Sequence, residues 1–197
     1  MRSTVIAASF LLGATLVPFA AYSQTLRDGV EAYTARRYDE AAQIFRALAE
    51  KGSVRAQTNL GAMYMTGLGV SRDGKEAVKW LTLASNQGDI TAKQDLAQAY
   101  AHGFGVPMNL ETAFKLFREA ATQGDAMSQS QLGFMYENGK GTKGDQMKAY
   151  VWYSLSGSMA PSWAKSSLEA LRRHMSDTQL REAEIALKYC RMDLQKC

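Results

Sequence analysis

Cysteine, histidine and proline are scarce in this chain, and each scarcity excludes a class of protein. Two cysteines and two histidines among 197 residues are too few soft ligands for a structural zinc site. Three prolines against 16 glycines exclude collagen-like and proline-rich architectures. A net charge of +4 is too small to indicate nucleic-acid binding by itself. We therefore expect a folded globular protein with no metal, no other cofactor and no nucleic-acid partner.

Long apolar runs are also missing, except near the N-terminus. Arg2 precedes the almost entirely apolar stretch Thr4–Phe19. The following Ala21-Tyr22-Ser23 places small residues at the positions that a signal peptidase recognises before its cleavage site. The pattern predicts a signal peptide, residues 1–23, because the stretch is shorter than the ~20 residues of a membrane span. An uncleaved anchor is the alternative, but no stop-transfer pattern follows. We expect an exported bacterial protein, soluble in the periplasm, with no membrane insertion after cleavage.

Catalytic motifs are nearly absent. The sequence contains no Gly-x-Ser-x-Gly elbow, no Walker loop and no His-Glu-x-x-His pattern. One Ser-x-x-Lys match exists, from Ser162 to Lys165, in which the lysine could deprotonate the serine one helical turn away. About one such match arises by chance in a chain of this composition, and the companion motifs are missing. Because Ser162 follows Pro161, helix capping explains it better. We expect no enzymatic activity, with a β-lactamase-like activity as the alternative.

What the chain does contain is a repeat of 36 residues. Similar residues recur three times at this spacing without a gap: Ala56, Ala92 and Ser128; Leu60, Leu96 and Leu132; Tyr64, Tyr100 and Tyr136; Ala77, Ala113 and Ala149. Small or apolar residues at i, i+4, i+5 and i+8 predict a first helix with one buried face. Gly67 and Gly69 predict its end, and Asp73 predicts the cap of a second helix, with Glu76 completing a capping box. One such hairpin cannot bury its apolar face alone, so the repeats should stack into a solenoid.

The repeat also predicts how the chain is divided. Residues 24–53 should form a first hairpin with a shorter turn, followed by three repeats over residues 54–161, namely 54–89, 90–125 and 126–161. Residues 162–197 lack the Gly-x-Gly loop and carry polar residues in place of the glycine and tyrosine. Polar substitution of this kind is typical of helices that cap the end of a solenoid.

The segment from Ala56 to Gly88 reads A-x3-LG-x2-Y-x2-G-x-GV-x2-D-x3-A-x2-W-x3-A-x3-G. This pattern resembles the SEL-like repeat (SLR, Suppressor/Enhancer-of-Lin-like) family, a relative of tetratricopeptide repeats. The second copy departs from it at Ala97 and Leu116, and the third has Ala160-Pro161 in place of the final glycine. The resemblance covers about residues 27–175. It implies an all-α fold, a right-handed superhelical α-solenoid of stacked hairpins, and a scaffold whose concave surface binds proteins or peptides.

The resemblance also suggests where a partner binds. Transferring tetratricopeptide groove positions to this register selects non-consensus residues of the three first helices: Arg55, Thr58, Met65, Gln94, Gln98, His102, Ser130, Phe134, Glu137 and Asn138. This mixture of amide, hydroxyl, charged and apolar groups suits an extended segment better than an apolar helix. The alternative is that these are solvated helix positions. Trp80, Trp152 and Trp163 are expected to fill the core.

The two cysteines, Cys190 and Cys197, pose a geometric question. Seven residues of continuous helix would separate their Cα atoms by about 10.5 Å, beyond the ~7 Å that a disulfide tolerates. If they pair, the helix must end near Cys190 and the tail must fold back. Two lone cysteines this close usually do pair in an oxidising compartment, so we predict a disulfide. Free thiols or an intermolecular bridge are the alternatives.

Together these features predict an exported scaffold or adaptor whose concave helical surface binds a protein or an extended peptide in the cell envelope. Two alternatives stay open: an immunity or inhibitor protein against a secreted toxin, and a cell-wall-directed protein that binds or hydrolyses peptidoglycan or β-lactams. We expect a monomer, although no feature of the sequence specifies the oligomeric state or the partner.

Overall fold

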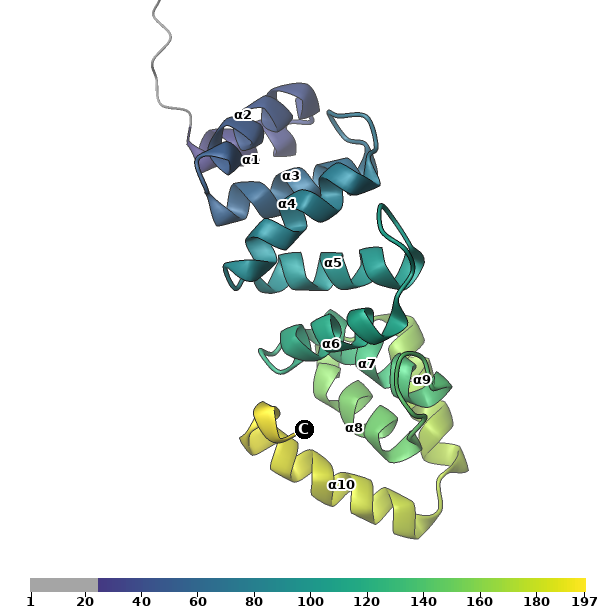
Figure 1. Cartoon of the computed structure of the whole chain (residues 1–197). Coiled ribbons are helices and arrows are strands. Elements are labelled where there is room, and N and C mark those ends of the chain that lie inside the picture. Colours follow the sequence, from purple (N-terminus) through teal and green to yellow (C-terminus); the bar gives the residue numbers. More distant parts are fainter. Residues whose placement is uncertain (1–24) are drawn as a thin grey trace, which may run out of the picture.

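The computed structural model describes residues 25–197, which form helices and contain no β-strand (Figure 1). The α-helices are α1 (Leu26–Thr34), α2 (Tyr38–Glu50), α3 (Val54–Thr66), α4 (Gly74–Asn86), α5 (Ile90–His102), α6 (Leu110–Ala121), α7 (Ala126–Asn138), α8 (Gln146–Ser156), α9 (Ser162–His174) and α10 (Asp177–Met192). Two short 3-10 turns, η1 (Gly157–Met159) and η2 (Leu194–Lys196), follow α8 and α10. The predicted signal peptide lies outside the described residues.

The helices stack as hairpins along an elongated molecule (Figure 1). The first helices α1, α3, α5 and α7 pack against the second helices α2, α4, α6 and α8 of their own hairpins. Successive hairpins then join through α2 with α3, α4 with α5, and α6 with α7. Leu60, Leu81 and Leu132 are fully buried between these layers. The predicted all-α solenoid of stacked hairpins is confirmed.

Local sequence signals explain where the helices begin and end. Gly67, at φ +79°, ends α3 in the left-handed conformation predicted for it. Inside the same helix, Gly61 lets α4 approach closely, because a Cβ there would lie 2.7 Å from Cγ of Leu81. At the start of α4, the Asp73 side chain accepts hydrogen bonds from two backbone N–H groups. The helix end at Gly67 and this N-cap agree with the sequence expectations.

The capping box predicted at Asp73 and Glu76 is half wrong. The Glu76 carboxylate does not return to the N-cap; it accepts hydrogen bonds from the Trp80 indole at 3.0 Å and from the Lys79 ammonium at 3.1 Å. Trp80 is 7% exposed, and a buried indole N–H needs an acceptor. Because it accepts this hydrogen bond, the Glu76 carboxylate points toward the next turn of α4 and not back to the N-cap.

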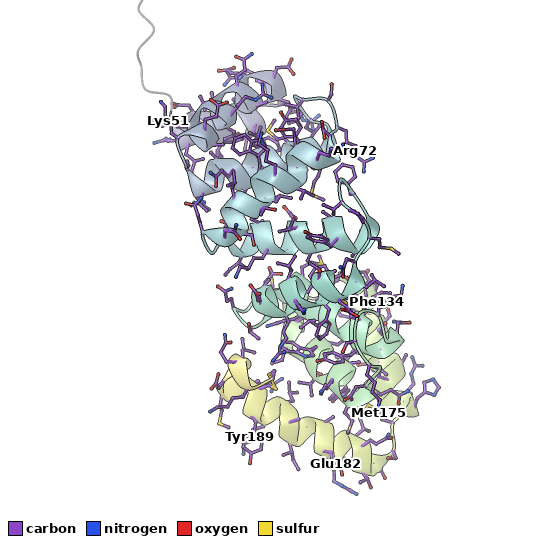
Figure 2. All side chains as sticks on the ribbon, in the orientation of Figure 1. Lys51, Arg72, Phe134, Met175, Glu182 and Tyr189 are labelled. Carbon is purple, nitrogen blue, oxygen red and sulfur yellow. A yellow bond between two sulfur atoms is a disulfide. The ribbon has the colours of Figure 1, made fainter. Side chains whose placement is uncertain are left out.

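The last two helices close the stack differently from the repeats. α9 follows α8, but α10 packs mainly against α8 and covers its outer side (Figure 1). Ala183, Leu187 and Cys190 form the buried face of α10. Tyr189 points away from the body of the protein on the opposite face (Figure 2). The predicted N-cap role of Ser162 is wrong, because α9 begins at Ser162 itself and Pro161 precedes it without a side-chain cap.

A disulfide joins Cys190 to Cys197, with the two Cα atoms 5.3 Å apart. α10 ends at Met192, and the chain folds back through η2, as the geometric argument required. The predicted pairing is confirmed in the structure. It fastens the C-terminal tail to the helix that covers the end of the core.

We expect the mature protein, recovered from an oxidising compartment, to contain no free thiol. Iodoacetamide applied to the protein unfolded without reductant should leave both cysteines unmodified, whereas dithiothreitol should expose two thiols. Opening this short loop should destabilise the C-terminal tail by about 2 kcal/mol. Intact-mass spectrometry measures the alkylation directly. A covalent dimer before reduction would instead support the intermolecular bridge.

Candidate partner-binding face

A cleft of about 320 Å³ opens where α5, α6 and α7 meet. Three of the predicted partner-binding residues line it: Gln98 and His102 from α5, and Phe134 from α7. Its other lining side chains are mostly apolar: Ala101, Met108, Leu110, Phe117 and Met135, with Gln131 and Lys140 as polar neighbours. The structure therefore brings predicted residues from two successive repeats to one hollow.

Phe134 is the centre of an aromatic group beside this cleft (Figure 2 labels its position). Its ring meets the ring of Trp163 edge to face, with centroids 6.1 Å apart, and the Lys140 ammonium lies 4.9 Å from its centroid. Trp163 is 39% exposed, so the expectation that it fills the core is wrong. Trp163 lies three repeat lengths after Arg55, one of the predicted groove residues. Extending that register to the fourth copy would have found it.

Two predicted residues at the end of α7 are already engaged within the protein. The Tyr153 hydroxyl donates to the Glu137 carboxylate at 2.7 Å. Burial, followed by this hydrogen bond, raises the pKa of Tyr153 well above its usual value, so the phenol stays protonated. The Asn138 amide donates to the carbonyl of Phe134 at 2.9 Å. These contacts hold the end of α7 in place and leave less of each side chain for a partner.

Two other predicted residues are removed from the candidate surface by their burial. Thr58 is 6% exposed and its hydroxyl donates to the carbonyl of Val54; Ser130 is fully buried and donates to Ala126. A hydroxyl can bond to the carbonyl one turn earlier in its own helix, which satisfies it without solvent. Including these two in the partner-binding set was therefore wrong. Of the remaining predicted residues, Arg55 is exposed, and Met65 and Gln94 are half-buried.

A second cleft, of about 230 Å³, lies at the N-terminal end of the stack. It is lined by Val30 and Tyr33 from α1, Phe45 from α2, and Asn59, Ala62 and Met63 from α3. The three α3 residues lie 72 residues before Gln131, Phe134 and Met135 of the first cleft. The two clefts therefore occupy the same structural position, two repeats apart. We call the surface that carries both clefts, formed by exposed residues of α1, α3, α5 and α7, the first-helix face.

Asp95 of α5 occupies the intermediate position on this face. It lies 36 residues after Asn59 and 36 before Gln131, each of which lines a cleft. Burial, and then the negative charges of Asp89 and Asp125, raise the pKa of Asp95 to about 6. No hydrogen bond or ion pair within residues 25–197 contributes to this shift. Asp95 was not among the residues selected by transferring tetratricopeptide groove positions, although it has the same repeat position as Asn59 and Gln131.

The Ser-x-x-Lys match does not form a nucleophile and base. The Lys165 ammonium donates to the carbonyl of Ser158 at 3.1 Å, not to the hydroxyl of Ser162. Within residues 25–197, no group of three His, Cys, Asp or Glu side chains could hold a metal ion. None of the helices in this part of the chain is long and apolar enough to cross a membrane.

Comparisons with known proteins agree with this architecture. Among solved structures, a Sel1 repeat protein from Oxalobacter formigenes is 28% identical, with a TM-score of 0.68 over 74% of this chain and 58% of that one. The protein c5321, described as a protective antigen of uropathogenic Escherichia coli strains with an SLR fold, is 27% identical, with a TM-score of 0.73 over 83% of this chain and 38% of that one. This chain thus spans less than two thirds of either relative. No curated protein matches its sequence.

The three central repeats match a known family directly. The Sel1 repeat matches residues 54–89, 91–125 and 126–160, which together make up more than half of the chain. Sel1 repeat proteins are generally non-enzymatic scaffolds that mediate protein–protein interactions. The match covers the hairpins that carry Asp95 and the cleft at Phe134, and the chain belongs to the Sel1 repeat family.

Proposed function

We propose that this protein is an exported scaffold or adaptor that binds an extended segment of another cell-envelope protein along its first-helix face. The observation that carries the proposal is the cleft at α5, α6 and α7, where Gln98, His102 and Phe134 from two repeats line one hollow. Export is supported by the signal-peptide pattern of residues 1–23 and by the pairing of Cys190 with Cys197.

The chemistry of the cleft favours an extended segment as the ligand. The amides of Gln98 and Gln131 can hydrogen-bond to a peptide backbone, and the aromatic ring of Phe134 offers an apolar anchor beside Trp163. The Lys140 ammonium and the Trp163 ring already hold Phe134 in place. A binding surface that is ordered before the ligand arrives loses little conformational entropy on binding.

Replacing Gln98 and Phe134 together with alanine should weaken capture of the partner by at least about tenfold, because an aromatic anchor and a backbone-binding amide are lost at once. The measurement is an affinity pull-down with tagged mature protein, Gln24–Cys197, from envelope extract of the host, followed by mass spectrometry. The affinity of the captured protein for each variant is then measured by calorimetry. Both substitutions lie on half-exposed helix positions, so the fold should persist.

The matched control is Leu83→Ala, which removes an exposed apolar side chain from the second-helix side, on α4. It should leave capture unchanged. A partner that binds the Gln98 and Phe134 double variant as tightly as the wild type would show that another surface is used. A partner lost only in the Leu83 variant would place binding on the opposite face.

A further inference from the structure

The first-helix face carries two equivalent apolar clefts, and between them lies the carboxylate of Asp95, which has no partner among residues 25–197. We propose that the bound segment carries a lysine or arginine whose side chain pairs with Asp95, and an apolar residue on each side that enters one of the two clefts. This inference rests on the proposed function and specifies the chemistry of its ligand.

The spacing of the anchors follows from the repeat. Phe134 and Ala62 occupy the same position two repeats apart, and Asp95 lies on the repeat between them. Each repeat lengthens the stack by about one helix diameter, roughly 10 Å, so two repeats cover roughly 20 Å along the first-helix face. An extended chain advances about 3.3 Å per residue, so the two apolar residues should be about six positions apart. The basic residue should lie near the middle of that interval.

Asp95 differs from the other carboxylates around it because its charge is not used by the fold. Asp89 accepts a hydrogen bond from the backbone of Ala92 at 2.8 Å, and Asp125 accepts one from Ser128 at 2.7 Å. Both are helix N-caps, whereas the Asp95 carboxylate receives no hydrogen bond from residues 25–197. Lys93, on the same helix, is paired with Glu119 of α6 at 2.8 Å.

The local electrostatics favour a cation at Asp95. Three carboxylates act on this part of the face, and a partly buried carboxylate is most stable when a positive charge lies beside it. An ammonium or guanidinium from the partner would supply that charge together with hydrogen bonds. An acidic side chain at the same position would be repelled.

The two clefts favour apolar side chains on either side. Val30, Phe45 and Met63 surround the first cleft, which no charged residue lines. Leu110, Phe117 and Met135 surround the second, where no carboxylate is present. Each cleft thus has room and apolar contacts for a leucine or phenylalanine side chain, and Asp95 lies at the repeat position between them.

The test is selection of phage-displayed random dodecapeptides on mature wild-type protein, Gln24–Cys197. Selected peptides, synthesised with a fluorophore, are then titrated by fluorescence anisotropy against the wild type, Asp95→Asn, and the Gln98 and Phe134 double alanine variant. We expect a lysine or arginine between two apolar residues about six apart. Asp95→Asn should weaken binding by at least about tenfold, as should a peptide in which the basic residue is replaced by glutamate.

The pH dependence gives a second readout of the same contact. Wild-type binding should weaken as the pH falls from about 8 to about 5, because Asp95, held near Asp89 and Asp125, has a pKa of about 6 and is neutralised on protonation. Binding by Asp95→Asn should be weaker and should depend on pH less than binding by the wild type. Asparagine has the same shape as aspartate, so a folded variant is expected.

The outcomes separate this inference from the proposed function. Peptides that need Gln98 and Phe134 but bind Asp95→Asn unchanged would overturn the role of Asp95 and leave the binding face intact. Selected peptides without a basic residue, or a selection that yields no peptide dependent on the face, would also overturn it. The proposed function itself fails only if the envelope partner from the pull-down binds the Gln98 and Phe134 double variant as tightly as the wild type.

Discussion

Replacing Gly105 with alanine is expected to destabilise the protein by about 3 to 5 kcal/mol. Gly105 has φ +74°, a left-handed conformation that costs an L-residue about 1 to 2 kcal/mol. A Cβ at Gly105 would also overlap the backbone of Gly74 at the start of α4. Backbone atoms cannot turn aside as a flexible side chain can, so relieving the overlap would push two hairpins apart. Urea unfolding followed by circular dichroism measures the change.

The second glycine of each repeat loop has this same role. Gly69 lies against the carbonyl of Tyr38 at the start of α2, and Gly141 lies against that of Leu110 at the start of α6. The loop of one hairpin therefore packs directly on the preceding hairpin, and glycine at this position sets the distance between them. A positive φ alone would not require a residue without a side chain. The close approach of the loop to the backbone of the preceding hairpin does require one.

Gly103 provides the matched control, because it lies in the same loop and also has a positive φ, +67°. A Cβ there would meet Met108 at 3.4 Å, which is ordinary contact. Gly103→Ala should therefore cost only about 1 to 2 kcal/mol, the conformational penalty by itself. Equal losses in the two variants would show that backbone conformation dominates and that contact between hairpins contributes nothing.

The fold could be predicted from the sequence because its signals are local and repeated. Gly67, Gly103 and Asp73 act within a few residues of themselves, so their effects can be inferred without knowing the neighbouring hairpin. Glu76 could not be assigned in the same way. Its capping role competes with the buried Trp80 indole one turn later, and only the packing of that indole shows which of the two contacts forms.

The candidate site was less predictable, because exposure depends on how the hairpins are rotated. The transferred groove positions place Gln98, His102 and Phe134 at a cleft, whereas Thr58 and Ser130, which occupy the repeat position of Gln94, turn inward. Trp163 and Asp95 could have been found by carrying the 36-residue register onto every first helix. The exposure of Trp163, and the burial of Asp95 without a partner among residues 25–197, required the structure.

Replacing Asp95 with asparagine is expected to stabilise the protein at about pH 8 by up to about 3 kcal/mol. Folding raises the pKa of Asp95 from its ordinary value of 3.8 to about 6, chiefly through burial. A carboxyl with a raised pKa contributes its stability in full below pH 3.8, where it is protonated in both states, and that contribution is lost as the pH rises through 6. The amide that replaces the Asp95 carboxyl would carry no charge at any pH, so Asp95→Asn should not lose stability as the pH rises.

The advantage of Asp95→Asn should therefore vanish near pH 4 and grow until about pH 7, as measured by urea unfolding across that range. Glu182→Gln, an exposed change on α10, should stay within about 0.5 kcal/mol of the wild type throughout. A pH-independent difference would contradict ionisation as the cause. A residue that weakens the fold when ionised, yet whose neutral replacement reduces ligand binding, is the combination expected of a carboxylate kept for recognition. If Asp95→Asn raises stability and leaves every ligand unaffected, the buried charge has no such role.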